Sequence, residues 1–407
     1  PAVVRMRLIR LNAIIPACKK VASLVDHRLN PFSTRWNTGK FPGGSVAIPR
    51  QNLRTPGPTP VPEDIVEAMS QPMINHRGPE FLELVNEVTD KLKQVFMTQS
   101  DLYILTASGT GAMEASIVNT LSPGDKVLSA TAGAFGDRFG DIARTYGAEV
   151  QRLEFEWGSP VEPDAIRRAL KDDPRIKAVL VTHNETSTGV TMDLEAIAKV
   201  VKGEFEKLLL VDGISSVCSL PLPTDSWGCD VVTAASQKGW MLPPGLAFIS
   251  FSEQAWEAHA QARMPRFYFD LSAYKRYHEI GQPPFTPAVS IMFALDLALD
   301  KILGEGMSRI FERHAEIGRM TREGVTHLGL SVFPDESVAS NTVTAVNVPE
   351  GIDARRLLAV MREERGVVLA GGQQSLSGKI FRVGHMGYTT PEDIQEVLHA
   401  LSAVLPQ

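Results

Sequence analysis

From residue 101 onward, short apolar runs alternate with longer segments in which apolar residues recur at helical spacing. An apolar run bounded by polar or glycine-containing segments predicts a buried β-strand, whereas apolar positions three and four residues apart predict a helix. The predicted strands are 102–106, 126–130, 178–182, 208–212, 230–234 and 246–251, and helical patterns such as 111–121 and 194–202 lie between many of them. This alternation is typical of an α/β domain built around a largely parallel sheet.

A second αβ region follows a long helical stretch at 289–303. Its predicted helices are 309–328, 353–365 and 391–405, and its predicted strands are 342–348 and 379–383. Because 407 residues are too many for one ordinary core, more than one domain is expected. We predict a basic N-terminal extension at 1–52, a large domain at 53–306 and a small C-terminal domain at 307–407.

Charge and composition narrow the class of partner. A formal net charge of -6 provides no electrostatic attraction for nucleic acid. No apolar run approaches the length that crosses a bilayer. Cys18, Cys218 and Cys229 lack the spacing of a disulfide framework or a metal site. We therefore expect a cytoplasmic protein that binds small molecules, with no nucleic-acid, membrane or metal partner.

The first 50 residues have a composition of their own, with many lysines and arginines and a single acid, Asp26. This pattern is typical of an organelle transit peptide. An upstream extension of the reading frame or a solvated tail would have the same composition, so all three interpretations stay open.

Five of the predicted strands end in polar or glycine-containing segments. In open α/β sheets ligands bind at the carboxyl ends of the strands, where these segments converge. The segments are 108–111, 133–136, 184–189, Asp212 and 236–238. We therefore expect them to line one ligand site.

Lys238 and Asp212 indicate the chemistry of this site. A lysine amine forms a Schiff base with pyridoxal phosphate, and a carboxylate beside the pyridine nitrogen keeps that ring protonated. A lysine next to a glycine is more often a solvated surface residue, so the pair alone does not decide between the two readings.

Three further motifs fit a cofactor site, and each has a structural alternative. Ser108, Gly109 and Thr110 open a predicted helix and are suited to a phosphate, although an ordinary capped turn has the same pattern. Phe135 can stack on a flat ring or belong to the core. Ser187 can bond a cofactor oxygen or cap the following segment.

Arg382 lies in an alternating strand of the predicted small domain. Its guanidinium can bind a substrate carboxylate through two parallel hydrogen bonds, or it can form a surface salt bridge.

Over residues 53–405 the chain resembles the class V branch of the fold-type I pyridoxal phosphate enzymes, in particular the alanine:glyoxylate and serine:pyruvate or serine:glyoxylate aminotransferases. The resemblance is carried by 55–59 (TPGPT), 76–81 (HRGPEF), 108–110 (SGT), 183–189 (HNETSTG), 211–212 (VD), 236–238 (SQK), 243–245 (PPG) and 378–384 (GKIFRVG). It implies a large domain with a mostly parallel seven-stranded sheet and a smaller C-terminal α/β domain.

The resemblance also implies residue roles. Lys238 would bind the cofactor covalently, Asp212 would pair with its pyridine nitrogen and Phe135 would stack on its ring. Gln237 and Ser187 would contact it, and Ser108, Gly109 and Thr110 would bind its phosphate, which Thr286 would reach from the other subunit of a homodimer. Arg382 would bind the substrate carboxylate.

The implied reaction is a ping-pong transamination from alanine or serine to glyoxylate or another small 2-oxo acid. Two departures concern substrate choice: position 135 is often tryptophan in animal relatives, and 283–285 reads Pro-Pro-Phe instead of a Tyr-His-rich run. One alternative is a cysteine desulfurase-like enzyme, although the sequence has no cysteine beyond Cys229 to act as its nucleophile. The other is a non-catalytic subunit of a soluble hydrogenase.

Overall fold

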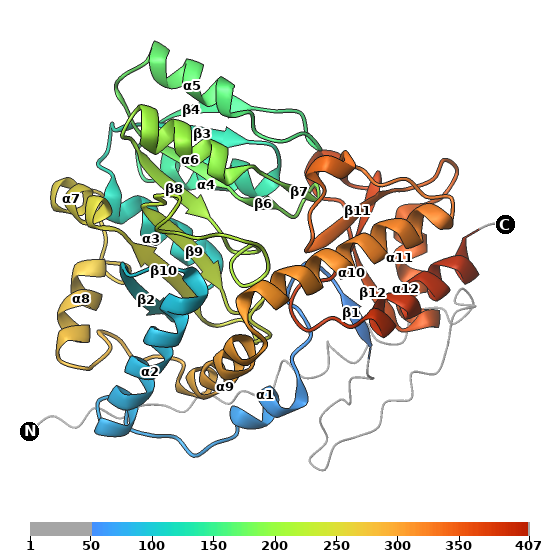
Figure 1. Ribbon diagram of the computed structural model, residues 1–407, viewed down its shortest axis with the longest axis horizontal. Coiled ribbons are helices and arrows are strands. Elements are labelled where there is room, and N and C mark those ends of the chain that lie inside the picture. Colours follow the sequence, from blue (N-terminus) through green and yellow to red (C-terminus); the bar gives the residue numbers. More distant parts are fainter. Residues whose placement is uncertain (1–50, 406–407) are drawn as a thin grey trace, which may run out of the picture. The chain divides into compact units, whose positions relative to one another are not determined.

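The computed structural model describes residues 51–405 (Figure 1). The predicted extension at 1–52, with its three interpretations, lies almost wholly outside the described residues. The described part contains a seven-stranded sheet, called the large sheet below, and a four-stranded sheet, called the small sheet. No helix within 51–405 is long and apolar enough to span a bilayer.

The large sheet has the strand order β2-β10-β9-β8-β5-β3-β4. Its strands are β2 (Asp101–Leu105), β3 (Lys126–Thr131), β4 (Glu149–Glu154), β5 (Ile176–Thr182), β8 (Leu208–Asp212), β9 (Val231–Ala235) and β10 (Ala247–Phe251). Strand β10 is antiparallel to both β2 and β9, and the other neighbouring pairs are parallel. The predicted α/β fold with a mostly parallel seven-stranded sheet is therefore confirmed.

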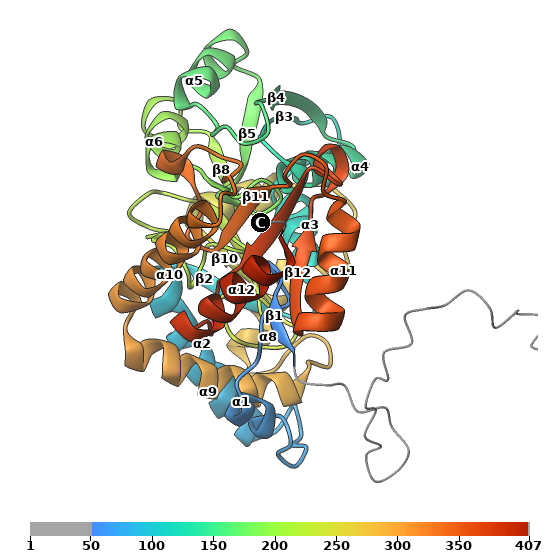
Figure 2. The ribbon, with the colours of Figure 1, turned by 90° about the vertical axis from the view of Figure 1, so that its right-hand side faces the viewer.

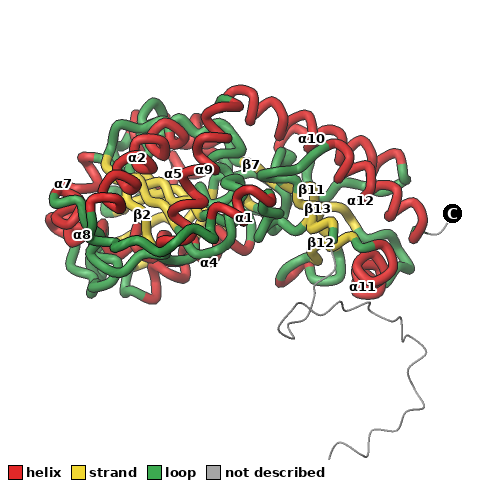
Figure 3. The backbone as a smooth tube through the Cα atoms, turned by 90° about the horizontal axis from the view of Figure 1, so that it is seen from below, coloured by secondary structure: helices red, strands yellow, loops and turns green. Residues whose placement is uncertain are grey.

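Both faces of the large sheet are covered by helices, and successive strand residues belong to two different apolar clusters, one on each face. Val179 and Val181 of β5 belong to one cluster, and Ala178 and Leu180 belong to the other. This explains why the strands read as continuous apolar runs. Figure 3 shows the strands enclosed between helices.

The first face is covered by α1 (Glu63–Ala68), α2 (Pro79–Phe96), α5 (Pro163–Asp172), α6 (Leu194–Ala198), which continues as a π-helical turn (Lys199–Glu204), and α9 (Val289–Glu305). The second face is covered by α3 (Gly109–Thr120), α4 (Ala134–Thr145), α7 (Glu253–Gln261) and α8 (Leu271–Glu279). The short strands β6 (Asn184–Glu185) and β7 (Val190–Thr191) form a hairpin after β5.

The small sheet has the order β1-β12-β13-β11. Its strands are β1 (Asn52–Arg54), β11 (Val343–Asn347), β12 (Val367–Gly371) and β13 (Ile380–Gly384), and its helices are α10 (Met307–His327), α11 (Ala354–Arg365) and α12 (Pro391–Val404). Figure 2 shows these helices gathered around the sheet. An apolar cluster that includes Phe381, Met361 and Leu401 joins them.

Strand β1 pairs in parallel with β12, so the first described strand belongs to the small sheet although the rest of that sheet lies beyond residue 340. The chain then crosses to the large sheet through 55–59. The predicted boundary after residue 306 coincides with the turn between α9 and α10 at Gly306. The domain limits themselves stay a prediction.

Candidate active site

Strands β2, β3, β5, β8 and β9 run in one direction, so their carboxyl ends meet at one edge of the large sheet. A cavity of about 160 Å³ opens there. It is lined by Ser108, Gly109, Thr110, Phe135, Arg138, Asn184, Thr186, Asp212, Ile214, Ser215, Gln237 and Lys238. Seven of the ten predicted site residues are thus brought together, and Ser187, Thr286 and Arg382 are not among the lining residues.

Lys238 lies just past β9, and its amine donates a hydrogen bond to the carbonyl of Pro56. Burial lowers the pKa of Lys238 to about 8, Asp212 opposes this change, and Arg382 and Arg138 add to it. The amine is therefore partly neutral near physiological pH, and a neutral amine is what attacks a carbonyl carbon.

Asp212 ends β8, the strand beside β9, and is only 4% exposed. Its carboxylate accepts from the amide of Ile214 at 3.0 Å and from the hydroxyl of Thr182 at 3.4 Å. Burial raises the pKa of Asp212 to about 6, an effect to which Glu185 adds. The acid is still mostly ionised at pH 7, with bonding capacity left for a cationic partner.

The segment after β1 lies directly on Lys238. Thr59 donates its amide to the carbonyl of Gln237 at 3.1 Å and its hydroxyl to the carbonyl of Lys238 at 2.9 Å. Gly57 has φ +124°, and a Cβ at this position would be 2.5 Å from Nζ of Lys238. Only glycine fits here without moving the lysine. The small sheet is thus tied to the reactive amine through residues 55–59.

Ser108 precedes the first turn of α3, but its side chain makes no capping hydrogen bond. A Cβ on Gly109 would be 2.6 Å from Cδ1 of Ile214, so this glycine allows α3 to approach the loop after β8. The start of α3 therefore offers hydroxyls and first-turn amides at the cavity, the groups that bind a phosphate at a helix N-terminus.

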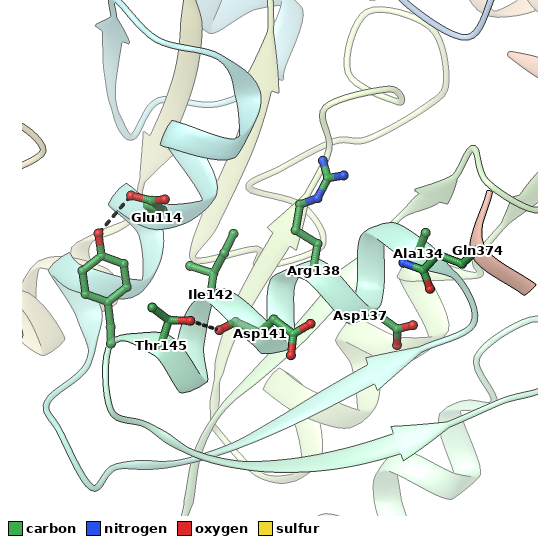
Figure 4. A pocket seen from close by; sticks show the side chains of 9 residues that line it. Glu114, Ala134, Asp137, Arg138, Asp141, Ile142, Thr145 and Gln374 are labelled. Carbon is green, nitrogen blue, oxygen red and sulfur yellow. Dashed lines mark hydrogen bonds between the residues drawn. The ribbon is translucent and has the colours of Figure 1, made fainter. Parts of the chain in front are cut away.

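Phe135 lies in the first turn of α4, and the guanidinium of Arg138 is 4.8 Å from the centre of its ring. Arg138 also lines a second pocket of about 300 Å³, shown in Figure 4. In that view Arg138 points away from the carboxylates of Asp137 and Asp141. Its charge therefore lies between the two pockets, on the cavity side of α4.

Ser187 is fully buried beside the start of α4. Its hydroxyl accepts from the amide of Ala134 at 3.0 Å and donates to the carboxylate of Glu185. The hydroxyl thus caps the start of α4. The sequence alternative is a cap on the segment that follows Ser187, whereas α4 precedes Ser187 in the chain. The contact of Ser187 with a cofactor stays a prediction.

Arg382 lies on β13, is 5% exposed and bonds backbone carbonyls instead of a carboxylate. It donates to Thr186 at 2.8 Å and to Gly371 at 2.7 and 3.0 Å. Burial lowers the pKa of Arg382 to about 10, so it stays cationic at neutral pH. Thr186 lines the cavity, so this buried cation lies directly behind the cavity wall.

Thr286 lies in the exposed loop between α8 and α9. The ring of Phe285 beside it stacks on Tyr268 at 4.7 Å between centres, and Phe267 is 81% exposed. Thr286 is thus exposed in its own chain and does not line the cavity.

Three lining residues, Arg138, Ile214 and Ser215, lie outside the segments that the sequence predicts for the site. Ile214 and Ser215 follow a strand that was already assigned to the site, so the strand-end rule was sufficient to find them. Arg138 is one helical turn beyond Phe135, and its position depends on where α4 begins. Asn184 and Thr186 belong to the predicted segment 184–189. The partners of Asn184 have no local signal, because it donates to the hydroxyls of Ser215 and Thr342, each at 2.8 Å, in distant segments.

Comparison with known proteins gives a family, two similar proteins and a similar crystal structure. Residues 52–397 match the family model described as aminotransferase class-V. The chain is 44% identical to the small subunit of a soluble hydrogenase from Synechococcus sp. (strain PCC 6716), covering 87% of this chain and 93% of that protein. It is 38% identical to a serine–glyoxylate aminotransferase from Methylorubrum extorquens, covering 83% of this chain and 87% of that protein. The crystal structure of an alanine–glyoxylate aminotransferase from Nostoc sp. is similar with a TM-score of 0.86 at 32% identity, covering 88% and 96%.

Proposed function

The chain belongs to the class V aminotransferases, and we propose that it moves the amino group of alanine or serine to glyoxylate or another small 2-oxo acid. Membership of the family makes it an aminotransferase with pyridoxal 5'-phosphate as its cofactor. The choice of substrates is supported by the serine–glyoxylate and alanine–glyoxylate enzymes to which the chain is similar. The observation that carries the proposal is an amine of lowered pKa beside a buried acid on the neighbouring strand, at one cavity.

The residues present fit this cofactor. Gln237 lines the cavity, and its side-chain oxygen is buried without a hydrogen-bond donor among residues 51–405. Such an acceptor costs about 1–3 kcal/mol when it stays unpaired, so a ligand that supplies a donor is favoured. The phosphate would be held at the start of α3 by Ser108, Gly109 and Thr110, and the pyridine nitrogen by Asp212.

When bound, the cofactor withdraws electrons from the substrate α-carbon and so makes its proton acidic. Lys238 would hold the cofactor through its amine before the substrate arrives. Once displaced, the same amine would accept the proton of the substrate α-carbon and later donate it to the cofactor. Asp212 stays ionised and favours the protonated ring nitrogen.

Arg382 orients the substrate in this proposal. Its three hydrogen bonds to carbonyls fix the guanidinium, which forms no salt bridge with a carboxylate of the described residues. A substrate carboxylate supplies the missing negative charge. Both an amino acid and a 2-oxo acid carry this group, so one arginine serves both half-reactions in turn, consistent with ping-pong order.

We propose that the active protein is a homodimer. Thr286 is exposed, and the apolar surface around it includes Phe267 and the stacked pair of Phe285 and Tyr268. Burial of Phe267 against a second copy would remove a large apolar side chain from water. Sedimentation at micromolar concentration is expected to give a dimer, which Phe267→Glu weakens and the exposed-surface control Glu257→Lys does not. A monomeric wild-type protein would refute the dimer.

The enzymatic proposal is tested by absorbance of the purified protein. We expect a visible band from bound cofactor that L-alanine or L-serine bleaches and glyoxylate restores. Lys238→Ala is expected to abolish this cycle. A protein that stays colourless after incubation with pyridoxal phosphate would refute the enzyme.

The two alternatives differ in what supports them. A desulfurase-like reaction requires an accessible thiol near the substrate, whereas Cys218 and Cys229 are both buried and burial raises the pKa of each. A hydrogenase subunit is supported by the names of relatives, such as the proteins from Synechococcus and from Anabaena cylindrica. That role predicts copurification with a redox enzyme that persists in Lys238→Ala.

A further inference from the structure

Glu185 is a buried carboxylate to which the proposed reaction assigns no role. It lies on β6, after the carboxyl end of β5, and is 1% exposed. One oxygen accepts from the amides of Phe135 and Gly136, each at 3.0 Å. The other accepts from the amide of Ser187 at 3.1 Å and from its hydroxyl. Every neighbour that bonds the group is thus a donor.

The hydrogen bonds around Glu185 favour an ionised carboxylate. Burial raises the pKa of Glu185, but the four hydrogen bonds to the charged form oppose that change. The amides of Phe135 and Gly136 belong to the first turn of α4, where the helix dipole also favours a negative charge. A proton on the oxygen that faces the amides of Phe135 and Gly136 would place a donor against two donors.

The chain is built to bring Glu185 to this position. A Cβ on Gly133 would be 2.4 Å from Cγ of Glu185 and 2.6 Å from the hydroxyl oxygen of Ser187. Any other residue at 133 would therefore push the start of α4 away from Glu185. The amide of Ala134 donates to Ser187, so three consecutive amides at this helix start are held by two residues, Glu185 and Ser187.

We propose that Glu185 is a positioning residue that fixes the ring of Phe135 toward the cofactor by holding the backbone of the first turn of α4. The inference rests on the proposed stacking role of Phe135. Phe135 lines the cavity. Its side chain has only two rotatable bonds, and the backbone limits the rotamers that they can adopt, so a shift of the backbone moves the ring. Loss of the carboxylate frees the amides of 135 and 136 and lets the ring leave its place.

The charge of Glu185 also reaches the other site residues. It raises the pKa of Asp212 and opposes the lowering of the Arg382 pKa by burial. Glu185 is therefore part of the electrostatic environment of the site, although it does not line the cavity.

A double-mutant cycle tests the proposal. We expect Glu185→Gln to weaken the affinity of the apo protein for pyridoxal phosphate about tenfold in the wild-type background, the size of one lost charge-assisted hydrogen bond. In a Phe135→Leu background the same change is expected to weaken the affinity for pyridoxal phosphate by less than about twofold, since the ring that Glu185 positions is absent. Asp230→Asn is the matched control: Asp230 is 3% exposed and bonds the amide of Leu209, but it precedes β9 and so lies at the opposite edge of the sheet.

Amide hydrogen exchange of the apo proteins provides a measurement that does not depend on the cofactor. Glu185→Ala removes both acceptors and is expected to speed exchange at 135 and 136 more than Glu185→Gln, which retains one carbonyl oxygen. If Glu185→Ala fails to fold, the comparison of amide exchange at 135 and 136 between Glu185→Gln and the wild type still tests the positioning role.

Equal losses of affinity in the two backgrounds would overturn the positioning role while leaving the aminotransferase proposal intact. Unchanged exchange at 135 and 136 in Glu185→Gln would also overturn it. A wild-type protein that binds no pyridoxal phosphate would instead refute the proposed function, and with it the role of Phe135.

Discussion

At the scale of single residues, the site is defined by charges placed where water cannot screen them. Lys238, Asp212 and Arg382 all have pKa values changed in the direction that burial causes. The sequence identified these three residues, because strand ends and motif spacing are local. It placed Glu185 in a segment of the site but gave it no role, and it did not predict the burial of Ser187, because both depend on where α4 meets the loop after β5.

The pKa of Lys238 gives a direct prediction. In the apo protein, modification of Lys238 by an amine reagent is expected to follow a titration near pH 8, because only the neutral amine reacts. Asp212→Asn removes the carboxylate that favours the ammonium form, so the titration should move to lower pH. Arg382→Met should move it to higher pH. A titration near the ordinary lysine pKa in the wild type would show that the amine is not desolvated.

Gly57 provides a second residue-scale prediction. Gly57→Ala places a methyl group against Nζ of Lys238 and strains a backbone with φ +124°. We expect at least about a tenfold loss of cofactor affinity and about 1–3 kcal/mol of stability. Gly351→Ala is the control, since Gly351 has φ +81° and nothing within 4 Å of the added Cβ. Equal effects of the two variants on cofactor affinity would mean that contact with Lys238 is unimportant.

At the scale of elements, the buried strands were predicted well because both of their faces are apolar. Strand β8 has the predicted bounds, and β5, β9 and β10 differ by one or two residues at their ends. Strand β4 was missed: it lies at the edge of the large sheet, none of its residues is buried, and its sequence EVQRLE contains no apolar run. Strand β12 was missed because it directly follows α11, with Gly366 alone between them. The pairing of β1 with β12 joins residues more than 300 positions apart, and no local pattern indicates it.

Arg54 tests this long-range pairing. It ends β1, is 3% exposed and donates to the hydroxyl of Thr389 at 2.7 Å, with Asp393 at 3.6 Å. Arg54→Met leaves these two acceptors without their cation, and we expect a loss of about 1–3 kcal/mol in urea unfolding. The exposed-pair control Arg319→Met should cost less than about 1 kcal/mol. A stable Arg54→Met protein would show that β1 is not anchored to α12 in this way.

At the scale of the whole molecule, three buried histidines make the folded protein less stable as the pH falls. Burial lowers the pKa values of His183 and His314 to about 4 and that of His385 to about 3. The unfolded chain binds their protons near pH 6.5, so their contribution to stability is present above that pH and is lost as the pH falls toward 4. Asp212, whose folded pKa is raised, acts in the opposite direction over the same range.

We therefore expect the urea midpoint of the apo protein to fall between pH 7 and pH 5, because three histidines outweigh the two carboxyl groups, Asp212 and Glu185, whose pKa values burial raises. Asp212→Asn should make this fall steeper, since the opposing contribution is removed. His327→Gln, which changes an exposed histidine, should not alter it. A midpoint that is constant from pH 7 to pH 5 would contradict the burial of these imidazoles.

In the proposed reaction one cavity, with Lys238 as its amine, transfers an amino group between small acids. The most direct measurement is a single turnover: the cofactor-loaded protein is mixed with L-alanine or L-serine without a 2-oxo acid, the released acid is quantified, and glyoxylate is then added. We expect one 2-oxo acid per Lys238 in the first step and an equal amount of glycine in the second, and neither in Lys238→Ala. Failure of both amino acids to release a 2-oxo acid, or release that persists without Lys238, would contradict it.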